Sequence, residues 1–205
     1  DVFFDEQDDG SYNYEAHATL DLEAHDLSDK GEISDATITL KAYDIYDANM
    51  DSHAELVRML SVGIYAKDSD GDMMADSILG EVAATATIDA DSDGVQDAGI
   101  SLLIKLEAVD ANRDGNPERA AATIEASEIV DKNEDGRPEK AVSVFIAAEA
   151  IDANSNGYFE SAKATATAWA GKDSDSSGKF EYEIGAKESY AATDSNDDGN
   201  PETIT

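Results

Sequence analysis

Apolar side chains occupy every second position over long segments of the chain, and those positions are nearly always even-numbered. The pattern is clearest in residues 12–24, 100–108, 142–150 and 162–170. The odd positions between them are mostly polar, as at Glu15. A period of two is typical of β-strands, because successive side chains of a strand point to opposite faces of a sheet. The pattern therefore predicts a series of long strands with one apolar face.

The alanine-rich segments allow a second interpretation. Residues 162–170 carry alanine at every even position, and alanine is the best helix former. The strict alternation and the frequent Thr and Val oppose a helix. We therefore expect an all-β protein.

A single aspartate recurs at a fixed interval of 21 residues along the whole chain. The positions are Asp5, Asp26, Asp47, Asp68, Asp89, Asp110, Asp131, Asp152, Asp173 and Asp194. A fixed period is the signature of a repeat architecture. We expect one repeat domain spanning residues 1–205. Each repeat is a nine-residue loop followed by about twelve residues, which hold a strand of about eleven.

The odd length of the repeat predicts the topology. Because 21 is odd and the apolar positions stay even, equivalent places in successive repeats face opposite ways, which a parallel solenoid would not allow. An antiparallel up-and-down meander of about ten strands keeps this parity if residues i and i+10 pair across each loop. That register pairs Tyr46 with Leu56 and sets Asp44 opposite Arg58, which is a favourable cross-strand charge pair.

Two further expectations concern how the meander is completed. Because the apolar face is rich in alanine, we expect the sheet to close as a flattened barrel or a two-sheet sandwich. Glu128 and Glu188 interrupt that face and have no charged partner in this scheme. The segments DVFF (1–4) and TIT (203–205) look like two parts of a split tenth strand. They either meet and close the sheet, complete a neighbouring subunit, or result from trimming of a longer array.

The charge of the chain limits its partners. Asp and Glu number 47 against 14 Lys and Arg, which gives a formal net charge of −33. Nucleic acid and an anionic membrane surface are excluded as partners, because both require a basic protein surface. The chain has no cysteine and no apolar run of membrane-spanning length, and it begins without Met, as a mature or trimmed chain would. Metal cations are the natural partners of such a surface.

The acidic residues follow a motif within each repeat. Numbered from its aspartate as place 1, the loop reads D-x-[DN]-x-D-G-x-x-[DE], so that oxygen-bearing side chains fall at places 1, 3, 5 and 9. Ca²⁺ takes six to eight oxygen ligands at about 2.3–2.6 Å, and a looped backbone can turn these side chains inward. Glycine at place 6 suits a sharp turn, and place 7 can offer its carbonyl. All three prolines stand at place 8, where they stiffen the loop exit.

These loops resemble the short calcium loops of thrombospondin type 3 repeats, dockerins and FG-GAP repeats. They differ from the EF-hand, whose closing acid comes at place 12. The resemblance implies calcium as the cofactor and the residues at places 1, 3, 5 and 9 as its ligands. It implies no fold, because these families differ in fold and their repeats differ from 21 residues.

Eight loops keep enough ligand side chains for us to expect about eight Ca²⁺ ions. The expected metal ligands are Asp47, Asn49, Asp51, Glu55, Asp68, Asp70, Asp72, Asp76, Asp89, Asp91, Asp93, Asp97, Asp110, Asn112, Asp114, Glu118, Asp131, Asn133, Asp135, Glu139, Asp152, Asn154, Asn156, Glu160, Asp173, Asp175, Ser177, Glu181, Asp194, Asn196, Asp198 and Glu202. The loop at Asp47 lacks the glycine, and the loop at Asp68 has it two places early, at Gly71. The loop at Asp26 carries Lys30 at place 5, which would repel an ion, so we expect it to be empty. For the loop at Asp5, with Gln7 and Asn13 at ligand places, we make no prediction of occupancy.

A salt-adapted acidic surface is the alternative explanation of the charge. Of the 47 acidic residues, 28 lie at ligand places, which favours metal binding. The three histidines are expected to be solvated, and no nucleophile–base pair or phosphate-binding loop stands out, so we expect no enzyme. A carboxylate pair for glycoside hydrolysis is singled out nowhere among the many acids.

These observations predict an extracellular or cell-surface structural protein stabilised by calcium, either a filament subunit or an adhesin stalk. Its expected partners are calcium and further copies of itself, in a fibre or surface array joined by strand addition at the termini. The alternative is a calcium-dependent carbohydrate-binding module with a glycan ligand. It would gather aromatic residues of the odd positions, such as Tyr43, Tyr65, Phe145 and Trp169, on one exposed surface.

Overall fold

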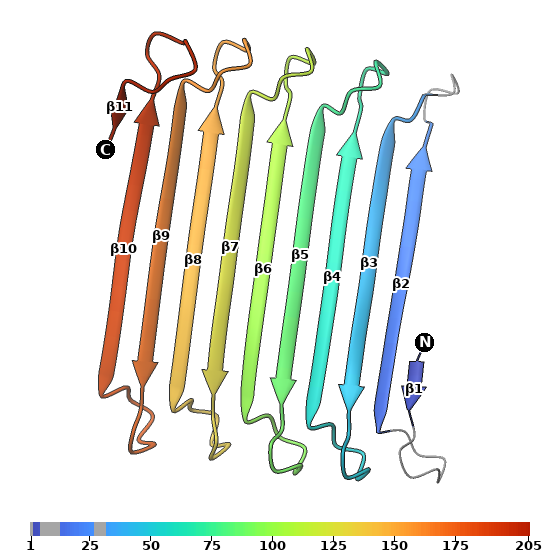
Figure 1. Ribbon diagram of the computed structural model, residues 1–205, viewed down its shortest axis with the longest axis vertical. Coiled ribbons are helices and arrows are strands. Elements are labelled where there is room, and N and C mark those ends of the chain that lie inside the picture. Colours follow the sequence, from blue (N-terminus) through green and yellow to red (C-terminus); the bar gives the residue numbers. More distant parts are fainter. Residues whose placement is uncertain (1, 5–12, 27–31) are drawn as a thin grey trace.

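The chain folds into one antiparallel β-sheet whose strands follow each other in chain order (Figure 1). The structure is a computed structural model that describes residues 2–4, 13–26 and 32–205. The strands are β1 (Val2–Phe4), β2 (Tyr14–His25), β3 (Asp35–Tyr46), β4 (Leu56–Lys67), β5 (Ser77–Ile88), β6 (Ala98–Val109), β7 (Arg119–Val130), β8 (Lys140–Ile151), β9 (Ser161–Lys172), β10 (Tyr182–Thr193) and β11 (Thr203–Ile204). No helix occurs in the described part of the chain. The all-β meander is confirmed.

The register is the one that parity predicts. Tyr46 pairs with Leu56 across its nine-residue loop, and every other pair likewise joins two even or two odd residues. Even residues of all strands therefore share one face of the sheet, here called the even face, and odd residues share the odd face. The helix interpretation of 162–170 is wrong, because these residues belong to β9.

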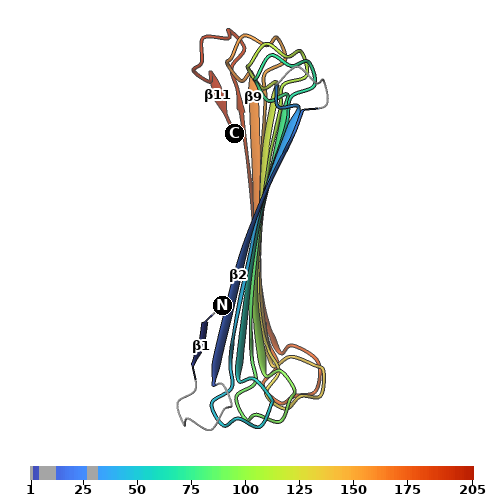
Figure 2. The same ribbon diagram turned by 90° about the vertical axis from the view of Figure 1, so that its right-hand side faces the viewer.

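The expected closure into a flattened barrel or a two-sheet sandwich is wrong. The sheet is open, with β1 and β11 at its two opposite edges (Figure 1). Seen along its plane, it is a single twisted layer (Figure 2). Full strands pair end to end without stagger, as in Tyr14 with Tyr46 and Leu56 with Ile88. Closing a barrel requires a stagger between strands, which this alignment does not provide.

The two terminal strands are short and far apart. β1 pairs only with Tyr14, Glu15 and Ala16 of β2, whereas β11 pairs with Ala192 and Thr193 of β10. The expectation that they meet within one molecule is therefore wrong. Among the described residues, the remaining outer edges of β2 and β10 have no sheet partner.

Several charged side chains on the even face have polar partners. Arg58 and Asp44 form the expected cross-strand pair, with Nη2–Oδ2 at 2.6 Å and Nε–Oδ1 at 2.8 Å. Glu128 has a partner after all, because Nζ of Lys140 lies 2.8 Å from its Oε1. The Tyr190 hydroxyl donates to Glu188 at 2.6 Å. Pairing only directly opposite residues missed both contacts. Lys140 is a diagonal neighbour of Glu128 on the next strand, and Tyr190 is two positions from Glu188 on the same strand.

A single layer leaves the apolar face uncovered. No apolar side chain among the described residues is buried, and the residues that are buried are polar or charged or lack a side chain. Leu22 of the even face is 67% exposed and Ile100 is 52% exposed. The buried side chains that the structure describes thus belong to the loops and do not form a hydrophobic core.

Candidate metal sites in the connecting loops

The eight loops that begin at Asp47 and at each following repeat share one backbone path. All have a left-handed residue at place 4 and another at place 6. At place 6 most carry glycine, but Ser52 (φ 76°) and Met73 (φ 70°) take the same conformation. Gly71, which stands two places early in the sequence, fills the left-handed place 4 instead (φ 82°). The two irregular loops therefore keep the common geometry.

The aspartate at place 1 organises each loop from within. In the loop at Asp152, the Gly157 N–H donates to Oδ2 at 2.7 Å and the Ser155 N–H donates to Oδ1 at 2.7 Å. Asp152 is only 1% exposed. The bond from the place-6 N–H to Oδ2 of place 1 recurs in all eight loops. A short acidic side chain is needed here because it must reach several amides of its own loop.

The other ligand places are fixed by similar bonds. In the loop at Asp110, Asn112 Oδ1 accepts the Asp114 N–H at 2.9 Å, and Asp114 Oδ1 accepts the Asn116 N–H at 2.9 Å. Oε2 of Glu118 accepts the Ala111 N–H at 2.5 Å, which closes the loop from place 9 to place 2. The hydrogen bond from the Ser155 hydroxyl, and after it the Ala111 amide, lower the pKa of Glu118. The Asn116 amide lowers the pKa of Asp114. Both carboxylates are thus held in the charged form that a metal requires.

Several loops bring three carboxylates to one point. In the loops at Asp68, Asp89, Asp110 and Asp173, one carboxylate oxygen from each of three residues lies within 4.8 Å of the other two. The four groups are Asp68, Asp70 and Asp76; Asp89, Asp91 and Asp97; Asp110, Asp114 and Glu118; and Asp173, Asp175 and Glu181. Such clusters repel themselves unless a cation or proton lies between them. The donors are oxygens throughout, as Ca²⁺ or Mg²⁺ prefers.

The loops at Asp47, Asp131, Asp152 and Asp194 share two bonds, from the place-6 N–H to Oδ2 of place 1 and from the place-2 N–H to Oε2 of the glutamate at place 9. Three of them also hold a buried carboxylate oxygen without a hydrogen-bond partner, at Oδ1 of Asp47, Oδ1 of Asp131 and Oε1 of Glu160. A buried anionic oxygen without a partner is costly. These atoms fit a cation ligand, and that they hold one stays a prediction.

The expectations for the first two loops lie outside the described residues. Gln7, Ser28 and Lys30 fall within 5–12 and 27–31, which the structure does not describe.

Loops two repeats apart lie side by side, because successive loops alternate between the two ends of the strands (Figure 1). The Asp89 N–H donates to the Glu55 carbonyl at 3.1 Å, and equivalent bonds join the later loops. The side chain at place 4 also reaches the preceding loop at that end. Ser92 Oγ donates to Oε1 of Glu55 at 2.7 Å, and Ser155 Oγ donates to Oε1 of Glu118 at 2.7 Å. Each end of the sheet therefore carries a row of linked loops.

Place 4 is the one position that the sequence motif missed. Glu134 stands there, and its carboxylate joins Asp91 and Asp93 of the neighbouring loop in one cluster within 4.8 Å. Burial raises the pKa of Glu134 to about 7, and the hydrogen bond with Asp93 and the nearby acids add to this effect. Its Oε1 is buried without a partner. The sequence signal for this contact is an acidic residue at place 4, considered together with the ligand residues of the loop two repeats earlier.

Two other place-4 residues present side chains of opposite charge to the loop two repeats earlier. Asp197 accepts hydrogen bonds from the side-chain amides of Asn154, at 2.6 Å, and of Asn156. Arg113 instead places its Nε 3.6 Å from Oδ2 of Asp76. The loop at Asp68 thus receives a positive side chain where the loops at Asp89 and Asp152 receive an acidic one.

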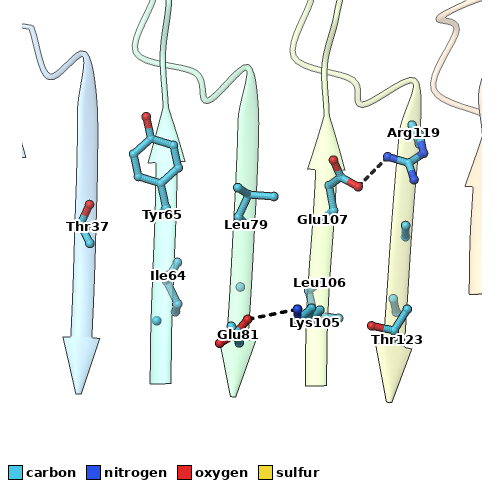
Figure 3. A pocket seen from close by; sticks show the side chains of 14 residues that line it. Thr37, Ile64, Tyr65, Leu79, Glu81, Lys105, Leu106, Glu107, Arg119 and Thr123 are labelled. Carbon is cyan, nitrogen blue, oxygen red and sulfur yellow. Dashed lines mark hydrogen bonds and ion pairs between the residues drawn. The ribbon is translucent and has the colours of Figure 1, made fainter. Parts of the chain in front are cut away.

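The aromatic residues of the odd face do not form one platform. Tyr43 stacks on His17 near one edge of the sheet, with ring centroids 4.8 Å apart, while Trp169 meets Phe180 edge-on at 5.2 Å on the other half. Between them a shallow hollow of about 570 Å³ lies over Gly63 and Gly80. It contains a single aromatic side chain, Tyr65, beside the ion pairs Glu81–Lys105 and Glu107–Arg119 (Figure 3).

Compared with protein-family models, with curated proteins and with solved structures, the chain matches none. Within the described residues, no helix has the length and apolar character that a membrane crossing would need.

Proposed function

We propose that the protein is a calcium-stabilised structural protein of the extracellular space or cell surface. The observation that carries this proposal is the repetition of one acidic loop geometry at every connection from β3 to β10, and again after β10. Among the side chains that the structure describes, no apolar one is buried. Calcium in these loops would connect successive strands and remove the repulsion among their carboxylates.

The stabilisation expected from calcium is large compared with that of a domain. If free Ca²⁺ is ten times the Kd, each site adds about 1.4 kcal/mol. Eight sites then add about 11 kcal/mol, which is similar to the total stability of an ordinary domain. Millimolar extracellular Ca²⁺ could fill sites of modest affinity, whereas the cytosol would leave them without metal. This difference favours an extracellular location.

The form of the molecule favours a structural role over a binding module. The loops form two rows at the ends of a wide, single-layer sheet, and the odd-face aromatics are dispersed instead of gathered. Open strand edges on β2 and β10 are suited to pairing with another chain. Pairing of one molecule's β2 edge with another's β10 edge is a heterologous contact that does not close, and it would propagate a fibre.

Electron microscopy tests this proposal. In millimolar Ca²⁺ we expect filaments or ribbons in which the strands run across the long axis, and we expect EDTA to disperse them. Returning Ca²⁺ should restore them, and Mg²⁺ at the same ionic strength serves as the control for general charge screening. Single 22 kDa particles with and without calcium would overturn the filament assignment.

A further inference from the structure

The even face is a broad apolar surface that nothing in the described structure covers. Its residues are Ala, Val, Leu, Ile and Tyr on every full strand, with Gly80 and six charged side chains as the exceptions. Leu106 at its centre is 55% exposed, and Ile64 is 43% exposed. The face measures about 40 Å along the strands and about 40 Å across nine full strands, since residues advance by about 3.4 Å and strands lie about 4.8 Å apart.

This face is electrically neutral although the chain is not. Its charged residues are Asp44, Arg58, Glu128, Lys140, Lys172 and Glu188, so the two signs cancel. Asp44 and Glu128 are bonded to Arg58 and Lys140 within the face. The formal charge of −33 is thus carried mainly by the loops and the odd face. A second copy of this highly charged chain meets the least repulsion at the even face.

In one row the two halves of the even face differ in side-chain size. One row of paired residues crosses the whole sheet at a single level, and it reads Leu22, Ile38, Ile64, Gly80, Leu106, Ala122, Ala148, Ala164 and Tyr190. The side chains are bulky on β2–β4 and small on β7–β9. Around the alanines lies an apolar hollow of about 560 Å³, bounded by Ile78 and Leu106 on one side and Tyr190 on the other.

We propose that a second copy of this chain packs its even face on the first, related by a two-fold axis that runs parallel to the strands close to β6. This operation lays the β2–β4 half of each copy on the β8–β10 half of the other. Ile64 then lies over Ala148 of the other copy and Ile38 over Ala164, while Leu106 meets its own counterpart near the axis. The bulky side chains of one copy enter the alanine hollow of the other.

The alternative two-fold axis, across the strands, fits worse. With the axis through the middle of the strands, it would place β2–β4 of one copy on β2–β4 of the other and set Ile38 and Ile64 against the charged Asp44 and Arg58. Close packing of two sheets requires side chains that interdigitate at a spacing of about 10 Å. The axis parallel to the strands instead sets both isoleucines against alanines.

The area of the face is ample for a stable dimer. A surface of about 40 Å by 40 Å exceeds the roughly 800 Å² per partner of an ordinary specific interface. Covering it would supply the hydrophobic core that the single layer lacks. This inference does not depend on which cation the loops hold, because it concerns a face that lies between the two rows of loops.

Cross-linking tests the pairing, and the chain offers a background free of cysteine. The double variant Ile64→Cys/Ala148→Cys, treated in Ca²⁺ with a short bis-maleimide, should give a covalent dimer. Within one chain the two thiols lie four strands apart, about 19 Å, which is too far for the reagent. The matched control is Ile64→Cys/Ala147→Cys, which moves the second thiol to the odd face of the same strand. Equal dimer yields from the two variants, or none from either, would overturn the proposal.

A second measurement uses mass in solution. At concentrations below those at which filaments form, light scattering of the wild-type protein should give twice 21.8 kDa. Leu106→Asp should weaken association at least tenfold, because two carboxylates would face each other in an apolar interface. Leu79→Asp changes an equally large, 46% exposed leucine of the neighbouring strand on the odd face, and should leave the mass unchanged. A monomeric wild type with a native circular dichroism spectrum would contradict the inference.

Discussion

The aspartate at place 1 behaves unlike a surface acid. Asp152 and Asp173 are each 1% exposed, and both oxygens of Asp152 accept backbone hydrogen bonds. The carboxylate therefore holds the loop in shape and also stands where a cation would bind. Removing its charge should affect both roles at once.

Asp152→Asn tests this residue. We expect one fewer bound Ca²⁺ by isothermal titration calorimetry and a loss of about 2–3 kcal/mol in the free energy of unfolding in Ca²⁺, because an amide cannot accept all these N–H bonds. The same exchange at the exposed Asp21 of β2 is the control and should change neither quantity. Wild-type calcium stoichiometry in Asp152→Asn would show that this loop holds no ion.

At the scale of single residues, the sequence predicted the places of the candidate ligands but missed place 4. The left-handed conformation there is adopted by residues as different as Arg113, Glu134 and Ser155, so no residue type marks it. Its side chain acts on a loop 42 residues earlier in the chain. Such a contact depends on how loops stack, which the motif of one loop does not contain.

The repeating element is a loop with two residues in the left-handed conformation, followed by a long strand. At Gly136 the space around a would-be Cβ is free of atoms within 4 Å, yet φ is 79°. At Gly63, in β4, the space is equally free and φ is not in the left-handed region. These two glycines separate backbone strain from steric crowding.

Gly136→Ala should therefore lower the free energy of unfolding by about 1 kcal/mol, the cost of a left-handed conformation for a residue with a Cβ. Gly63→Ala should be neutral or slightly stabilising, because alanine loses less conformational entropy in a strand. Urea unfolding of both variants in Ca²⁺ measures the difference. Equal effects would mean that place 6 does not need glycine.

At the scale of elements, alternation and the odd repeat length were enough to predict strands, topology and register. Pairs such as Tyr46 with Leu56 follow from parity alone, because a shift by one residue would move every apolar side chain to the other face. Closure of the sheet was predicted wrongly. Whether a meander closes depends on the stagger between strands, and a repeat that aligns every strand end to end leaves the sheet open.

The whole molecule is a sheet held at both ends by rows of acidic loops, with its apolar face uncovered. Without a buried core, the strands gain little hydrophobic stabilisation from their own chain. We therefore expect most of the stability to come from cations in the loops and from the covering of the even face, with calcium as the cation that holds the sheet together.

Thermal unfolding monitored by circular dichroism, in 2 mM Ca²⁺ and in excess EDTA, measures how far calcium stabilises the sheet. We expect EDTA to lower Tm by tens of degrees or to unfold the sheet at room temperature, restored Ca²⁺ to reverse the change, and Mg²⁺ at matched ionic strength to restore much less. A Tm that is the same in Ca²⁺ and in EDTA would contradict this expectation.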